Sequence, residues 1–65
     1  MYKIKVKKTG LGWKVLLIKK WWVLWITDTV SVIAFGYEYK VDEQINEWVE
    51  HFKIPHEMVS VPNGA

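Results

Sequence analysis

The sequence predicts an α+β domain in which an antiparallel sheet of three to four strands carries one C-terminal helix on one face. Three observations support this fold class. Residues 2–8 alternate between apolar side chains and lysine, residues 13–37 are rich in β-branched and aromatic side chains, and helical periodicity is clear only over 42–53. We expect one domain over residues 1–65, because a chain of this length buries only about 60% of its unfolded surface.

The first two predicted strands form a hairpin. In residues 2–8 the apolar side chains fall on one face and the lysines on the other, as in a half-buried strand. The glycine-rich stretch 9–12 indicates a turn, and the second strand is predicted over 13–18. Two alternatives stay open at Lys19-Lys20: the chain turns there, or one long strand continues through a bulge.

Two further strands are predicted, over 21–26 and 30–37. The stretch 27–29, Thr-Asp-Thr, is interpreted as the turn between them, because Asp and Thr side chains hydrogen-bond to their own backbone in turns. We interpret this apolar region as strands rather than as a transmembrane helix. It is short and rich in β-branched residues, and Asp28 near its centre would cost about 2.5–3.5 kcal/mol in a bilayer.

The predicted helix spans residues 42–53 and carries a single apolar stripe. Its apolar residues recur at helical spacing: Ile45, Trp48, Val49 and Phe52. Pro55 disfavours helical geometry at the preceding residue and so ends the helix. Residues 57–61 are compatible with a short final strand.

Charge is segregated along the chain, and the residue types exclude several functions. Seven lysines precede the first acid, whereas the remainder of the chain holds seven acids and two lysines. The absence of cysteine excludes disulfides and thiolate zinc sites. Glu47, His51 and His56 could share a metal, but we interpret them as a solvated helix face. No catalytic, metal-binding or cofactor-binding residues are predicted, and the protein is not expected to be an enzyme.

One helix about 10 Å wide can cover only one face of the sheet, because strands lie about 4.8 Å apart. Apolar residues in 21–26 occupy both strand parities, so one set should face away from the helix. At least one tryptophan of this segment should therefore be exposed in a monomer. The predicted partner-binding residues combine these side chains with the lysines: Trp21, Trp22, Leu24, Trp25, Lys3, Lys5, Lys7 and Lys20.

The stretches "WKVLLIKKWWVLWI" and "DEQINEWVEHF", a lysine- and tryptophan-rich hairpin followed by an acidic helix, resemble small orphan phage-encoded proteins. The resemblance covers most of the chain. It implies a non-catalytic inhibitor or adaptor that acts on a bacterial host complex, such as a defence or transcription machine, in the host cytoplasm. It transfers no role to any single residue.

The function expected from the sequence is stoichiometric docking onto a protein partner, since Trp and Tyr are favoured anchors of interfaces. A structural homodimer is one alternative. Nucleic-acid binding by lysines and stacked aromatics is another, to which "FGY" at 35–37 adds a faint echo of RNA-binding sheets. Association with a membrane is not favoured.

Overall fold

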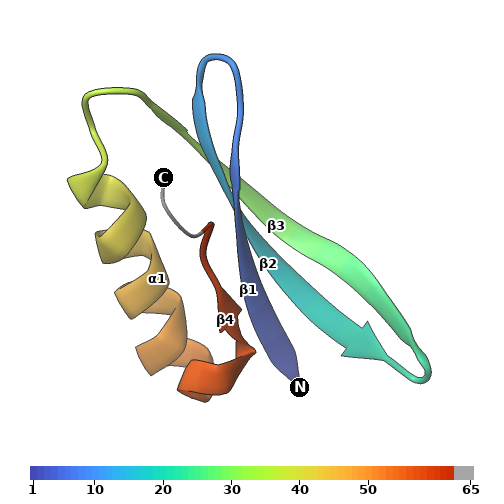
Figure 1. The fold of residues 1–65 in the computed structure, drawn as a ribbon. Coiled ribbons are helices and arrows are strands. Elements are labelled where there is room, and N and C mark those ends of the chain that lie inside the picture. The colour runs from blue at the N-terminus through green and yellow to red at the C-terminus, as the bar shows by residue number, and fades with distance from the viewer. Residues whose placement is uncertain (63–65) are drawn as a thin grey trace.

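The structure is a computed structural model that describes residues 1–62, and it contains a four-stranded sheet with one α-helix (Figure 1). The elements in chain order are β1 (Tyr2–Lys8), β2 (Gly12–Trp21), β3 (Leu24–Ala34), α1 (Tyr39–Phe52), the 3-10 turn η1 (His56–Met58) and β4 (Val59–Ser60). The strand order is β3-β2-β1-β4. The α+β class and the C-terminal helix are confirmed. The sheet, however, is mixed rather than purely antiparallel, because β4 pairs parallel with β1.

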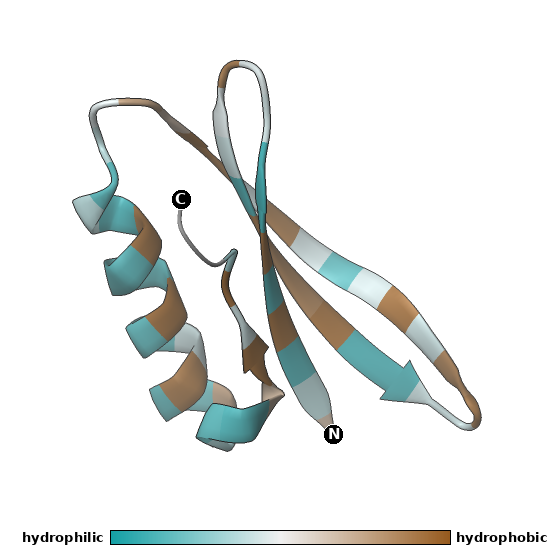
Figure 2. Ribbon diagram, viewed as in Figure 1, coloured by the Kyte–Doolittle hydropathy of each residue, from teal (hydrophilic) through white to brown (hydrophobic). Residues whose placement is uncertain are grey.

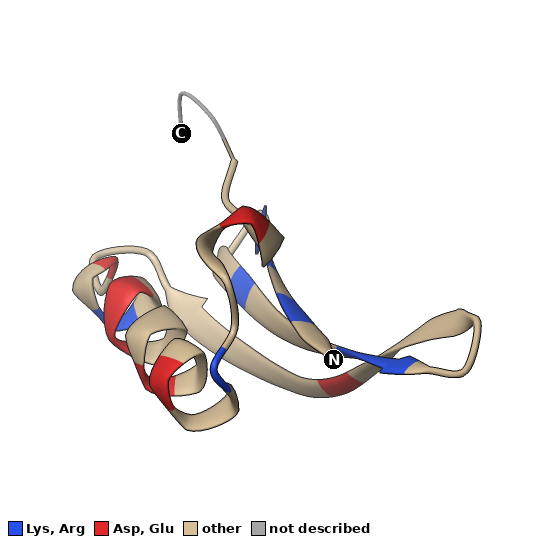
Figure 3. Ribbon diagram, turned by 90° about the horizontal axis from the view of Figure 1, so that it is seen from below, with Lys and Arg blue, Asp and Glu red and all other residues tan. Residues whose placement is uncertain are grey.

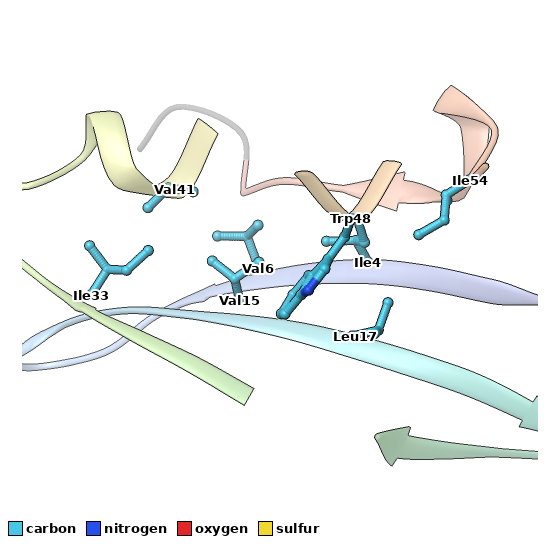
Figure 4. Close-up of a cluster of buried hydrophobic side chains, with 8 residues drawn as sticks. All are labelled: Ile4, Val6, Val15, Leu17, Ile33, Val41, Trp48 and Ile54. Carbon is cyan, nitrogen blue, oxygen red and sulfur yellow. The ribbon is translucent and has the colours of Figure 1, made fainter. Parts of the chain in front are cut away.

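The hydrophobic core lies between α1 and one face of the sheet. Figure 4 shows the Trp48 ring reaching from the helix to the strands, among side chains of β1 and β2. The buried residues are Ile4, Val6, Val15, Leu17, Ile33, Val41, Trp48 and Ile54. The rest of the predicted helical stripe is partly buried against this cluster. At one end, the rings of Tyr2 and Phe52 pack with their centroids 4.5 Å apart.

The strand register separates two faces of the sheet. Ile4 pairs with Leu17 and Val6 with Val15, so these side chains share the face that α1 covers, which we call the covered face. The residues between them on β1 are lysines, and they lie on the opposite or uncovered face. The alternation of apolar and hydrophilic residues along β1 can be followed in Figure 2.

The hairpin between β2 and β3 differs from the prediction. Lys19 and Lys20 lie inside β2, so the chain does not turn at these residues. The alternative of one long strand continuing to residue 26 is also wrong, because β2 ends at Trp21. The predicted strand 13–18 lies within β2, whereas the predicted strand 21–26 is divided among the end of β2, the turn and the start of β3. The turn falls at Trp22-Val23, between the paired residues Trp21 and Leu24. Neither central residue is typical of a hairpin turn, which is why the sequence did not reveal it.

The predicted turn at 27–29 is wrong, because these residues continue β3. Leu17 pairs with Thr29 whereas Ile18 pairs with Thr27, and Asp28 is left over as the extra residue of a β-bulge. The polar side chains that suggested a turn thus mark an irregularity within the strand.

The ends of the later elements also shift. The strand predicted to reach residue 37 ends at Ala34, where a turn is closed by the Tyr37 N–H donating to the Ala34 carbonyl at 3.2 Å. The helix begins at Tyr39 rather than at residue 42 and ends at Phe52. The segment 57–61 contains most of η1 and only the two-residue strand β4.

Candidate docking surface

The end of the β2–β3 hairpin projects beyond the rest of the sheet. Tyr2 of β1 pairs with Lys19, and the Met1 carbonyl accepts a hydrogen bond from the Lys20 N–H at 2.9 Å. From Trp21 onward, β2 pairs only with β3. Figure 1 shows this ribbon pointing away from α1. We call residues 21–26 the hairpin tip.

All six residues of the hairpin tip are apolar and exposed. Their exposed fractions are Trp21 59%, Trp22 83%, Val23 73%, Leu24 56%, Trp25 37% and Ile26 47%. The sequence predicts that only one of the two parity sets faces away from the helix. Both sets are uncovered, because the tip extends past the sheet that α1 covers.

The uncovered face carries a second exposed surface, basic on one side and apolar on the other. The strand pairing places five lysines there: Lys3, Lys5, Lys7, Lys14 and Lys20. It places five apolar residues beside them: Leu16, Ile18, Trp25, Val30 and Val32. Among residues 1–62, no element packs over this face. Figure 3 shows lysines along the strands and acidic residues gathered mainly on α1.

The two surfaces meet at Trp25, whose ring has two ammonium groups close to it. The Nζ atom of Lys3 lies 4.4 Å from the ring centroid, and the Nζ atom of Lys20 lies 5.8 Å from it. Cations over an exposed aromatic face contribute about 0.5–1 kcal/mol each. These contacts hold the indole against the sheet and leave it 37% exposed, the least of the tip residues. The arrangement offers a partly exposed indole with two cationic donors against it.

The structure divides the predicted partner-binding residues between these surfaces. Trp25, Lys3 and Lys20 form one cluster on the uncovered face, and Lys5 and Lys7 continue it along β1. The remaining predicted residues, Trp21, Trp22 and Leu24, lie in the hairpin tip.

Sequence reasoning missed the apolar half of the uncovered face on β3, namely Val30 and Val32. Both are exposed, at 45% and 71%. The bulge at Asp28 shifts the parity of β3, so that the face of Val30 cannot be inferred from that of Trp25 by counting along the strand. Leu16 and Ile18 lie on the same face of β2 as Lys14. This mixture of apolar residues and lysine on one face is the sequence feature that indicates an apolar region on the uncovered face.

Neither a metal centre nor a membrane-spanning helix emerges from the described residues. Over 1–62, no three His, Asp or Glu side chains are grouped so that they could hold a metal ion. The His51 ring instead packs edge-on against Phe52, with centroids 4.7 Å apart. In the same part of the chain, every helix is too short or too polar to cross a bilayer.

Comparison of the chain with protein-family models, curated proteins and solved structures returned no match.

Proposed function

We propose that this protein is a small, non-catalytic binding module that docks stoichiometrically onto an acidic protein through the uncovered face of its sheet. One observation supports this most directly. The Trp25 ring is contacted by the ammonium groups of Lys3 and Lys20 on a face over which no described element packs. Aromatic anchors surrounded by polar groups are the usual centre of protein interfaces.

The composition of the face favours a protein partner. Apolar side chains of β2 and β3 border the lysines of β1, so a partner gains both apolar burial and charge pairing. Basic residues at the margin steer an acidic surface into register. In keeping with the resemblance to small phage-encoded proteins, the particular role we propose is that of an inhibitor or adaptor of a bacterial host complex in the cytoplasm.

Nucleic-acid binding is the main rival, and the position of the other aromatics weakens it. Phe35 follows β3 and packs edge-on against Trp13, with centroids 6.2 Å apart. The 35–37 segment is therefore in a turn and does not add a stacking strand to the lysine-bearing face. A structural homodimer through the same face is the second rival.

Affinity capture from bacterial lysate tests the proposal, with Trp25→Ser as the test variant and Leu11→Ser as its control. Leu11 is 87% exposed at the opposite hairpin, so its loss removes a comparable exposed apolar group elsewhere. We expect a captured protein that is retained by Leu11→Ser and lost by Trp25→Ser. Replacing Lys3, Lys5 and Lys7 with Gln should weaken the same capture.

Salt separates the partner classes. Binding to nucleic acid should fall by orders of magnitude between about 50 and 200 mM salt, because counterions are released from phosphates. Docking onto a protein through Trp25 should change much less. Equal capture by both serine variants, or capture that vanishes on nuclease treatment, would contradict the proposal. So would sedimentation showing that the uncovered face is occupied by a second copy.

A further inference from the structure

We propose that the hairpin tip inserts into the interfacial region of an anionic lipid bilayer, so that the module acts at a membrane surface. This inference goes beyond the proposed function. It concerns residues 21–26 at the end of the hairpin rather than the broad face of the sheet.

The hairpin tip is apolar on both sides of its ribbon. Trp21 pairs with Leu24 on one side of the ribbon, while Trp25 pairs with Lys20 on the other. Trp22 and Val23 form the turn, and they are the most exposed residues of the tip, at 83% and 73%. A flat protein surface can cover only one side of such a ribbon. A bilayer surrounds an inserted ribbon on every side.

The residues behind the tip carry positive charge that is complementary to an anionic membrane surface. Lys19 and Lys20 immediately precede it and face opposite sides of the sheet. Lys3 contacts the ring of Trp25, and the Met1 backbone is hydrogen-bonded beside Lys20. Lys3, Lys19 and Lys20 form a basic collar at the level where lipid headgroups would lie. Each lysine near an anionic membrane surface strengthens binding.

Few acids oppose this collar. Asp28 occupies the bulge of β3, and Glu57 lines a shared hollow with Lys3, Lys5 and Trp25. The six residues of the tip itself carry no charge.

The length of the tip limits how deep it can insert. Each arm of the hairpin contributes three residues, one of them in the turn, and at about 3.3 Å per residue these give a reach of at most about 10 Å. Amphipathic elements bind with their apolar side about 5–10 Å deep at the boundary between headgroups and acyl chains. Deeper insertion is unfavourable, because a two-stranded ribbon has unpaired backbone groups at its edges that require water. The reach of the tip therefore fits the interface and not the hydrocarbon core. Tryptophan is the residue most enriched at that depth.

The conformation at the apex fits a functional role for Trp22. Its φ is 59°, in the left-handed region where a bulky residue is strained and glycine is favoured. Strained positions of this kind cluster at functional sites. Trp22 gains little packing in return, since its side chain is the most exposed of the tip.

Vesicle co-sedimentation of the full chain tests the inference. The probes are vesicles of phosphatidylcholine containing a quarter phosphatidylglycerol, compared with phosphatidylcholine alone, at about 0.1 M salt. We expect binding to the anionic vesicles, with quenching of tryptophan fluorescence by lipids brominated in the acyl chain. Trp22→Ser should abolish most of this binding and quenching, whereas Leu11→Ser should preserve both. Far-UV circular dichroism checks that each variant is folded.

A second pair of variants tests the collar. Lys19→Gln/Lys20→Gln should lower partitioning onto anionic vesicles about 25-fold, as two lysines near the membrane surface imply. Lys7→Gln/Lys14→Gln removes the same charge from a cross-strand pair at the other end of the sheet, and it should have a smaller effect.

Three outcomes would overturn the inference. The folded protein fails to partition onto anionic vesicles, the two serine variants bind equally well, or a second copy is found to shield the tip in solution. The first two outcomes do not bear on capture of a protein by the uncovered face, which is tested with Trp25→Ser, so the two proposals can fail separately.

Discussion

The two tryptophans Trp48 and Trp22 should differ sharply in their contribution to stability. A tryptophan side chain buries about 150–250 Å² when fully enclosed. Trp48 is 8% exposed, so its truncation to alanine removes most of that burial. At about 25 cal/mol per Å² the lost burial is roughly 3–6 kcal/mol. Trp22 is 83% exposed, so its truncation to alanine removes only about 25–45 Å² of buried surface. The corresponding loss of stability is roughly 1 kcal/mol or less.

Urea unfolding followed by far-UV circular dichroism measures both effects. A 65-residue domain has a free energy of unfolding of about 3–10 kcal/mol, so Trp48→Ala should lose between about a third and all of its stability. Trp22→Ala should keep its cooperative transition, with a midpoint lower by about 1 M or less. A loss above about 2 kcal/mol for Trp22→Ala would refute the reasoning. It would mean that the ring is buried in solution, and a dependence on protein concentration would identify a second copy as the cover.

Three further predictions test a close approach, a strained residue and a cation–ring contact. Gly12→Ala should destabilise the fold by about 1–3 kcal/mol, because its Cβ would overlap a backbone carbonyl of β3. Gly10→Ala, which has open space around its Cβ, should be close to neutral in the same urea titration, and equal losses would contradict the packing argument. Lys53→Gly should raise the melting temperature by relieving a left-handed residue at φ 53°, a gain of about 0.5–1 kcal/mol; a lower melting temperature would argue against that strain. A double-mutant cycle between Lys3→Gln and Trp25→Leu should give a coupling of about 0.5–1 kcal/mol, and a value near zero would show that the cation and ring do not interact.

Local periodicity was enough to predict the elements that make the core. In β1, lysine at every second position leaves only one face that can be buried, and Ile4 and Val6 are indeed buried there. In α1, the apolar spacing defined the side that meets the sheet, and Trp48 is buried on it. Each of these elements has a single periodic pattern, so the local sequence alone determines its type and its buried face.

Turn chemistry misled the prediction where tertiary pairing overrides it. Thr27 and Thr29 both pair with β2, although Thr-Asp-Thr has the composition of a turn. Trp22-Val23 makes the actual turn with no residue that favours one. Its position is fixed by the register between β2 and β3, which is a property of two segments and not of either alone. The same register brings Trp25 beside Lys3, a contact across three strands that counting along the chain cannot reveal.

The parallel pairing of β4 with β1 affects the order in which the sheet can be completed. Each hairpin pairs two strands that follow one another in the sequence. The β1–β4 pairing instead joins Ile4 to Val59, which is synthesised only near the end of the chain. During synthesis the outer side of β1 thus stays without a neighbour while β2 and β3 can already assemble. Until β4 is synthesised, β1 is an exposed edge strand. Its lysines at 3, 5 and 7 then disfavour pairing with a strand of another nascent chain, because charged side chains on an edge strand oppose such pairing.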